Sequence, residues 1–174
     1  MFKKGKYHAC CPRWGITQLG TGESVHWVDH SLNPRFAVYA PGTPADGTDD
    51  VVLDKETCLI WERSPLSEAK EWSAAILYSY TKVSAGRKGW RLPTIEELLS
   101  LVDPTQSNPT LPIGHPFLNV KLDNFYWSST LGMSSPPYYS WGYNFGNADT
   151  SNCLKSTKLH VWLVRGGFGH DYAF

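Results

Sequence analysis

The C-terminal part of the chain constrains the fold most, because helical periodicity ends at residue 105. Four prolines, at positions 104, 109, 112 and 116, predict a long loop there. Short β-like segments follow at 125–130, 138–145 and 159–164. The last segment has the period of two that a strand requires, and its two alternating sets are Leu159, Val161 and Leu163 against His160, Trp162 and Val164. The end of the chain is therefore predicted to form a sheet.

The residues before this loop predict a hairpin and two helices. Apolar runs at 51–53 and 58–61 surround a polar turn, which is a β-hairpin pattern. A first helix is predicted from Ser67 to Gly86, with one buried stripe made of Ala69, Trp72, Ile76, Tyr80 and Val83. Residues 94–97 form a capping box that opens a second helix. This order of elements predicts the α+β class, with an antiparallel sheet and long irregular loops.

The first 45 residues differ in character from the rest of the chain. Prolines and glycines interrupt short apolar pieces, such as those at 25–28 and 36–39. We expect residues 1–45 to be an N-terminal arm whose short strands pack on a domain formed by residues 46–174. The N-terminus is basic, but no apolar segment follows it, so no signal peptide is expected. A protein of this kind that acts outside a cell would be displayed on a surface or carried on a virion.

The four cysteines, Cys10, Cys11, Cys58 and Cys153, lack the paired spacing of a structural zinc site. Unpaired, partly buried thiols are the favoured interpretation, and a disulfide from Cys10 or Cys11 to Cys58 or Cys153 stays open. His26 and His30 are four residues apart, but their surroundings favour extended chain, and no metal site is predicted.

Charge and motifs exclude several functions. The 16 Lys and Arg balance the 16 Asp and Glu, so the formal net charge is zero. Binding to nucleic acid needs a dense basic surface, and a membrane span needs about 18 consecutive apolar residues; the sequence shows neither. The serine-hydrolase elbow, the phosphate-binding glycine loop and the His-Glu-x-x-His motif are also missing from it. The sequence therefore predicts no nucleic-acid partner, no membrane insertion, no catalytic residue and no cofactor. Arg91 and Arg165 are assigned structural roles.

Aromatic residues gather in one nearly uncharged stretch. Residues 125–145 hold eight of the 24 aromatic residues, and Asp149 is the only charged residue between 125 and 152. The remainder is rich in Ser, Gly, Asn and Thr, a composition typical of paratopes, where Tyr and Trp give contact area and small polar residues give adaptable hydrogen bonds. The alternative is that the aromatics fill the core. Trp127, Trp141 and Phe145 are assigned to the core.

Ten residues of the C-terminal segment are predicted to contact a ligand. Tyr138 and Tyr139 follow two prolines and are expected to be exposed. The others are Tyr143 and residues of a turn-rich region from 144 to 152 and of the strand at 159–164. Ordinary turn chemistry and packing under the arm are the alternatives for these two regions. Trp162 is expected to face outward as a binding hot spot. The full set is Tyr138, Tyr139, Tyr143, Asn144, Asn147, Asp149, Ser151, Asn152, His160 and Trp162.

Several motifs, in this order, resemble the Lcl C-terminal domain family. They are Asp46-Gly47-Thr48, Leu59-Ile60-Trp61, Trp90-Arg91-Leu92-Pro93, Tyr126-Trp127-Ser128-Ser129 and Leu163-Val164-Arg165-Gly166-Gly167. This family is related to the formylglycine-generating-enzyme-like branch of the C-type lectin fold. The resemblance implies two helices flanking a small antiparallel sheet, with the ligand surface on the C-terminal strands and loops. Two positions depart from the family pattern: Cys58 stands where glycine is usual, and Trp162 where arginine often stands.

The resemblance also implies a function of display or adhesion more than of catalysis. The variable proteins of diversity-generating retroelements form a similar subset, in which scattered C-terminal positions are randomised. We therefore expect a non-enzymatic receptor-binding module of a virus or microbe that binds a protein or glycan on a cell surface, its oligomeric state being open. One alternative is a glycan-binding adhesin that needs no calcium, since the calcium-binding lectin motifs do not occur. Another is an oxidising enzyme of the formylglycine-generating type, which would need a second thiol beside Cys153.

Overall fold

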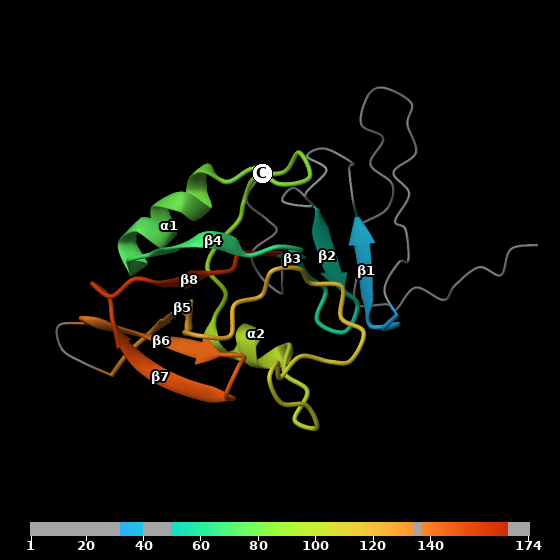
Figure 1. The fold of residues 1–174 in the computed structure, drawn as a ribbon. Coiled ribbons are helices and arrows are strands. Elements are labelled where there is room, and N and C mark those ends of the chain that lie inside the picture. The colour runs from blue at the N-terminus through green and yellow to red at the C-terminus, as the bar shows by residue number, and fades with distance from the viewer. Residues whose placement is uncertain (1–31, 40–49, 134–136, 167–174) are drawn as a thin grey trace, which may run out of the picture.

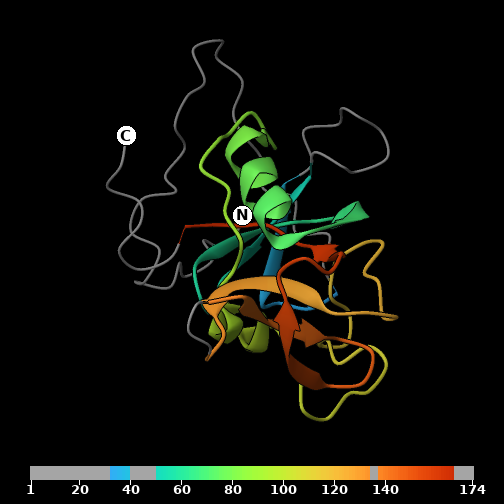
Figure 2. The ribbon, with the colours of Figure 1, turned by 90° about the vertical axis from the view of Figure 1, so that its left-hand side faces the viewer.

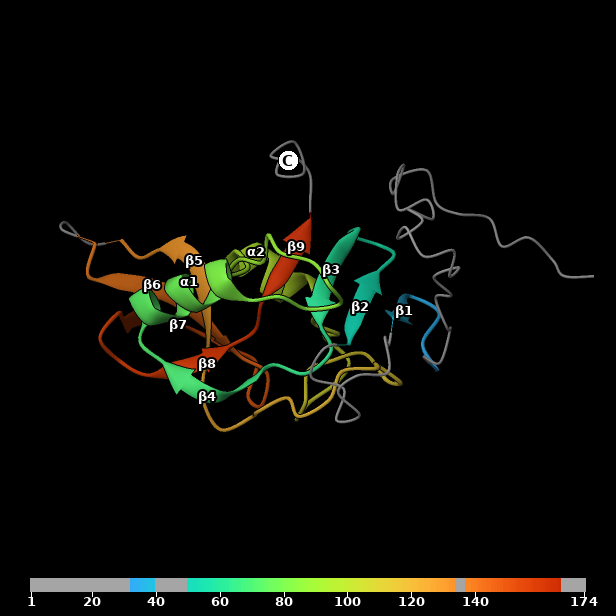
Figure 3. The same cartoon turned by 90° about the horizontal axis from the view of Figure 1, so that it is seen from above.

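The computed structural model describes residues 32–39, 50–133 and 137–166, and within them the chain is mainly β-structure (Figure 1). The described elements are β1 (Phe36–Tyr39), β2 (Val51–Asp54), β3 (Leu59–Glu62), β4 (Leu66–Lys70), α1 (Trp72–Thr81), α2 (Ile95–Ser100), β5 (Tyr126–Leu131), β6 (Tyr139–Asn144), β7 (Asp149–Leu154), β8 (Leu159–Val161) and β9 (Val164–Gly166). The strands form two sheets that lie side by side (Figures 1 and 3).

The predicted α+β class, with two helices flanking a small antiparallel sheet, is wrong. In the described residues two short helices, of ten and six residues, accompany nine strands in two sheets. The first helix is shorter than predicted because residues 66–70 are not helical. They form β4, which pairs with β8 through Leu66↔Val161 and Lys70↔Leu159.

The first sheet has the strand order β1-β2-β3-β9 and is antiparallel. It confirms both the predicted hairpin and the predicted strand at 36–39. The hairpin turn is fixed by the buried carboxylate of Asp54, which lies 2.6 Å from the Arg35 guanidinium and accepts a hydrogen bond from the Thr57 hydroxyl at 2.7 Å. Cys58 closes the turn with a positive φ of 59°. That left-handed backbone is the conformation glycine adopts most readily.

The second sheet has the order β4-β8-β5-β6-β7. It is mixed rather than antiparallel, since β5 and β8 run parallel and pair at Tyr126↔His160. The predicted strand at 159–164 is split, because β8 joins this sheet and β9 joins the first. The strand β7 lies where the sequence analysis placed a turn region.

Two apolar clusters hold the sheets and helices together. The first joins Phe36 and Trp61 of the first sheet to Tyr126 and Tyr143 of the second, with Leu98 of α2 and its C-cap residue Leu101. The second packs Ala75 of α1 against Trp127, with further contributions from Ile60, Trp90, Leu92 and Leu163. The core assignment of Trp127 and Phe145 is confirmed, whereas Trp141 is only half-buried.

The two helices contrast in how well the sequence predicted them. The capping box of α2 is confirmed: the Glu97 N–H donates to the Thr94 hydroxyl at 3.2 Å, and the Glu97 carboxylate accepts from the Thr94 N–H at 2.8 Å. The Arg91 guanidinium lies 2.6 Å from that carboxylate, which fits its structural assignment. The stripe predicted for α1 is wrong, since Tyr80 is 72% exposed and Val83 is also exposed.

The N-terminal arm predicted for residues 1–45 lies mostly outside the described residues. Cys58 is disulfide-bonded, which corrects the favoured interpretation of four unpaired thiols, while Cys153 is a free, half-buried thiol. No helix within the described residues is both long enough and apolar enough to cross a membrane.

Candidate ligand-binding surface

The hairpin of β6 and β7 carries the aromatic stretch that the composition singled out. The two strands pair over their full length, so that Tyr139 lies opposite Leu154, Trp141 opposite Asn152 and Tyr143 opposite Thr150. Residues directly opposite one another in an antiparallel pair share one face of the sheet. In Figure 2 this hairpin, in orange and red, lies below helix α1. We call the part of this face formed by Tyr139, Trp141, Thr150, Asn152 and Leu154 the β6–β7 face.

Burial changes along the hairpin. At the Tyr143 end the sheet belongs to the core: the Tyr143 ring lies 4.8 Å from that of Phe145, and its hydroxyl is 3.2 Å from the Thr110 hydroxyl. At the other end Tyr139 and Trp141 are half-buried, and Thr150, Asn152 and Leu154 are exposed. One continuous strand face therefore runs from core to surface.

The open end of the β6–β7 face combines aromatic, amide and aliphatic groups. The Asn152 amide lies over Gly132, where a Cβ would overlap it and come within 2.7 Å of the Tyr139 Cβ. The neighbouring residues Leu131, Met133 and Tyr138 are exposed as well, but Leu131 pairs with Ser140 and so lies on the opposite side of the sheet.

The structure exposes some of the predicted contact residues on or beside this face. Tyr138 is 61% exposed, and Tyr139 and Asn152 belong to the face itself. Asn147 and Asp149 are exposed at the turn, where the Asp149 N–H donates to the Asn147 side chain at 3.3 Å. Ser151 pairs with Gly142 and so points to the opposite side of the sheet.

Four other predicted contact residues are buried, namely Tyr143, Asn144, His160 and Trp162. The expectation that Trp162 faces outward is wrong, since its side chain is 0% exposed. Alternation misled here because all three residues of β8 and the Trp162 that follows them are buried, so neither side of this segment faces solvent. Asn144 instead accepts the Gly146 N–H at 2.8 Å, and the His160 Nε2 lies 3.0 Å from the Asp123 carboxylate.

The sequence analysis missed Trp141, Thr150 and Leu154 as members of this face. Alternation grouped Trp141 with Tyr143 and Phe145, and the β6–β7 register confirms that Trp141 and Tyr143 share a side of the strand. The available signal was the polar segment 149–154. Read as a second strand, it would have placed Thr150, Asn152 and Leu154 opposite the β6 aromatics.

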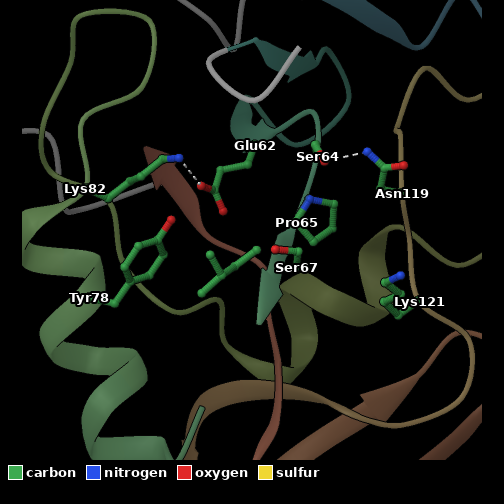
Figure 4. Close-up of a pocket in the computed structure, with 9 residues that line it drawn as sticks. Glu62, Ser64, Pro65, Ser67, Tyr78, Lys82, Asn119 and Lys121 are labelled. Atoms are coloured by element: carbon green, nitrogen blue, oxygen red, sulfur yellow. Dashed lines mark hydrogen bonds and ion pairs between the residues drawn. The ribbon is translucent and has the colours of Figure 1, made fainter. Parts of the chain in front are cut away.

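A separate cavity of about 320 Å³ lies between the β3–β4 connection, the end of α1 and residues 119–121 (Figure 4). On its wall the Glu62 carboxylate, 1% exposed, pairs with the Lys82 ammonium at 3.0 Å and accepts the Leu163 N–H at 3.0 Å. Burial raises the pKa of Glu62 against the opposing effect of Lys82. Burial alone would lower the pKa of Lys82, but Glu62 and Tyr78 reverse this and the pKa is raised. The pair ties the residue after α1 to β3.

The residues that the structure describes include no group of three or more His, Cys, Asp or Glu side chains that could hold a metal ion. Burial raises the pKa of the Cys153 thiol, which disfavours the reactive thiolate. What the β6–β7 face offers is contact area with scattered polar groups.

A β-rich scaffold that presents Tyr, Trp and Asn side chains on one hairpin has the form of a recognition domain. The Lcl C-terminal domain family matches residues 50–165, and the chain belongs to this family, as its motifs suggested. Membership places the chain among lectin-like, ligand-binding domains. The comparison with curated proteins found no match.

Proposed function

We propose that this chain is a non-enzymatic binding domain that recognises a protein on a cell surface through the β6–β7 face. The observation that carries the proposal is the open end of that face, where Tyr139, Trp141 and Asn152 share one side of the sheet and the exposed Tyr138 precedes them in the chain. Aromatic side chains with few rotatable bonds supply contact area at low entropic cost. With one charged residue between 125 and 152, recognition depends on contact and not on long-range attraction.

The exposed Leu154 favours a protein ligand over a glycan. It lies opposite Tyr139 on the β6–β7 face, and burying such a side chain stabilises a complex only if the partner is apolar there. The alternative, a calcium-independent glycan-binding adhesin, is supported by the exposed Tyr138 ring, which would stack on a sugar. The two proposals differ in one measurement: free saccharides, added with a chelator present, compete with a glycan ligand and leave a protein ligand bound.

Removing the cluster should abolish binding without unfolding the domain. In the double variant Tyr139→Ala/Asn152→Ala we expect at least a tenfold weaker Kd, because aromatic groups in the centre of a contact surface dominate affinity. The labelled chain would be tested on protein and glycan arrays in parallel, with the melting temperature measured by calorimetry. The matched control is Leu77→Ala/Tyr80→Ala, which removes two exposed side chains, one of them also a tyrosine, from α1. Equal loss in both variants, or undiminished binding by the first, would contradict the proposal.

An enzyme of the formylglycine-generating type receives less support. Its chemistry needs a second thiol beside Cys153, and Cys153 is a free thiol whose hydrogen bond goes to the Ser151 carbonyl, at 3.6 Å. Cysteine-oxidising activity that disappeared in Cys153→Ser would favour the enzyme.

Diversification by a retroelement makes a positional prediction. If the chain is a variable protein, a near-copy of its 3′ coding segment should lie beside a reverse transcriptase gene and differ from it at adenines. We expect those differences at the codons of exposed positions such as Tyr139 and Asn152, because a rigid core tolerates little change in volume. Sequencing the locus checks this. Differences concentrated at the buried Tyr126 and Tyr143 would contradict it.

A further inference from the structure

Gly132 follows the last residue of β5 and lies at the Tyr139 end of the β6–β7 face. Its N–H donates to the Tyr139 carbonyl at 2.9 Å, so the chain is still paired with β6 at this residue. A Cβ built on Gly132 would overlap the Asn152 side-chain oxygen, and it would lie 2.9 Å from the Asn152 Cγ and 2.7 Å from the Tyr139 Cβ. Non-bonded carbon atoms pack at about 3.5–4.0 Å, so any side chain at position 132 must displace one of these groups.

Backbone conformation does not explain the glycine at position 132. A positive φ favours glycine over residues that carry a side chain. Gly86, Gly89, Gly114 and Gly166 have a positive φ, whereas Gly132 does not. An alanine could therefore adopt the same backbone conformation, and what the position excludes is the space that a Cβ would occupy.

The Asn152 side chain occupies that space from two strands away. It belongs to β7 and reaches a residue at the end of β5, although β6 lies between these strands in the sheet. Asn152 is nevertheless exposed, so its amide remains accessible to a ligand. An exposed side chain ordinarily samples several rotamers, and contact with the Gly132 backbone favours the one that lays the amide across β6.

We propose that Gly132 is a positioning residue of the β6–β7 face: because it lacks a side chain, the Asn152 amide can lie across β6 beside Tyr139. This inference rests on the proposed function, in which the face contacts a protein ligand. A group that is held in place before binding loses less conformational entropy when the ligand arrives, so pre-organisation strengthens binding. A residue outside the predicted contact set therefore influences affinity.

The response to Gly132→Ala follows from how each neighbour is held. The Tyr139 Cβ is attached to a backbone that pairs with both β5 and β7, and its side chain is half-buried. The Asn152 amide is at the end of an exposed side chain and can rotate into solvent. The alanine should therefore displace the Asn152 amide and leave the fold intact.

Nuclear magnetic resonance of the full chain tests this displacement without a ligand. The side-chain amide signals of Asn152 are assigned by their absence in Asn152→Ala. We expect the order parameter of this amide to exceed about 0.6 in the wild type and to fall below that value in Gly132→Ala. The matched control is the side-chain amide of Asn147, which lies at the opposite end of the hairpin and should be unchanged.

Circular dichroism checks that each variant is folded. If Gly132→Ala does not fold, Gly132→Ala/Asn152→Ala decides the question. Folding of the double variant supports Asn152 as the group that the alanine displaces. Failure of both variants to fold assigns the glycine to packing against Tyr139 alone and overturns the proposal.

A double-mutant cycle tests the effect on binding, with the array proteins that bind the wild-type chain as probes. Gly132→Ala should weaken their binding about two- to tenfold, the range expected for the entropy of fixing one side chain. The same substitution should cause a smaller loss in an Asn152→Ala background, because the amide that it displaces is already missing. The close approach to Tyr139 is present in both backgrounds and cancels in this comparison.

Two results would overturn the proposal: an unchanged order parameter of the Asn152 amide in Gly132→Ala, or equal losses of affinity in the two backgrounds. Failure of the proposed function gives a different result. In that case no array protein binds the wild-type chain through this face, while the order parameter of the Asn152 amide still shows whether Gly132 positions it.

Discussion

Replacing Trp162 by alanine is expected to lower the free energy of unfolding by about 3–5 kcal/mol, the range for truncating a buried aromatic side chain. The side chain is completely buried. Its ring lies 4.9 Å from Phe117, edge to face, and 5.5 Å from each of Trp61 and Phe145. The indole N–H donates to the Glu62 carbonyl at 2.8 Å. Because Trp61 belongs to the first sheet and the segment with Trp162 links β8 to β9, the loss weakens the junction of both sheets.

Urea titration followed by tryptophan fluorescence would measure this loss, with Tyr138→Ala as the control. Tyr138 is also aromatic and was also predicted to contact ligand, but it is largely exposed, so its truncation should change stability by no more than about 0.5 kcal/mol. A Trp162→Ala variant that unfolds at the wild-type urea concentration would contradict the burial of this side chain and reinstate it as a candidate contact residue.

Local patterns predicted the parts of the fold that local interactions determine. The β2–β3 hairpin and the capping box of Thr94 and Glu97 depend on residues within a few positions of one another, and both were predicted from sequence. Segment 66–70 contains Glu68, Ala69 and Lys70, all good helix formers. It forms a strand because β8, about ninety residues further along the chain, pairs with it. No pattern within the segment encodes that partner.

Strand β7 was missed for a different reason. Its Asp, Ser and Asn residues are depleted in strands and favoured in turns, so the sequence analysis placed a turn there. The actual turn covers the four residues between β6 and β7, where Ala148 has a positive φ of 60°. A polar strand is stable here because it lies at the edge, with little apolar surface to bury.

The candidate site was predicted in location but only partly in membership. Composition identified the segment, and Tyr138, Tyr139 and Asn152 are exposed or half-buried there. Whether Tyr143 or Trp141 faces solvent depends on where the core ends beneath one strand face. Phe145 and Thr110 cover Tyr143, and Thr110 comes from a loop whose position no pattern in 125–152 encodes.

Lys82→Met is expected to destabilise the fold by roughly 3–5 kcal/mol near neutral pH, because it leaves a buried carboxylate without its partner. Glu62 would keep the Leu163 N–H but lose the ammonium that lies 3.0 Å away. The methionine keeps most of the length and apolar contact of the lysine stem. Thermal and urea unfolding of the two proteins at the same pH would give the difference.

The loss of folding stability in Lys82→Met should become smaller as the pH falls. In the folded protein burial raises the pKa of Glu62, and Lys82 partly opposes this rise. Without Lys82 the pKa rises further, so the folded variant takes up a proton at a pH where the unfolded chain is still ionised. At a pH between the pKa of Glu62 in the unfolded chain and its higher pKa in the folded variant, the folded state binds more protons than the unfolded state. Acidification therefore stabilises the folded variant, and a rising pH removes that stabilisation. The difference between variant and wild type should therefore be larger at pH 8 than at pH 5.

The double variant Glu62→Gln/Lys82→Met separates the charge effect from lost packing. It removes both charges, while the glutamine side-chain oxygen can still accept the Leu163 N–H, so most of the stability lost in Lys82→Met should return and the pH dependence should disappear. If the double variant is as unstable as Lys82→Met at every pH, the loss in Lys82→Met does not come from an unpaired buried carboxylate, and the ion pair is not what holds the end of α1 to β3. If Lys82→Met is as stable as wild type, the carboxylate must be hydrated, contrary to its nearly complete burial.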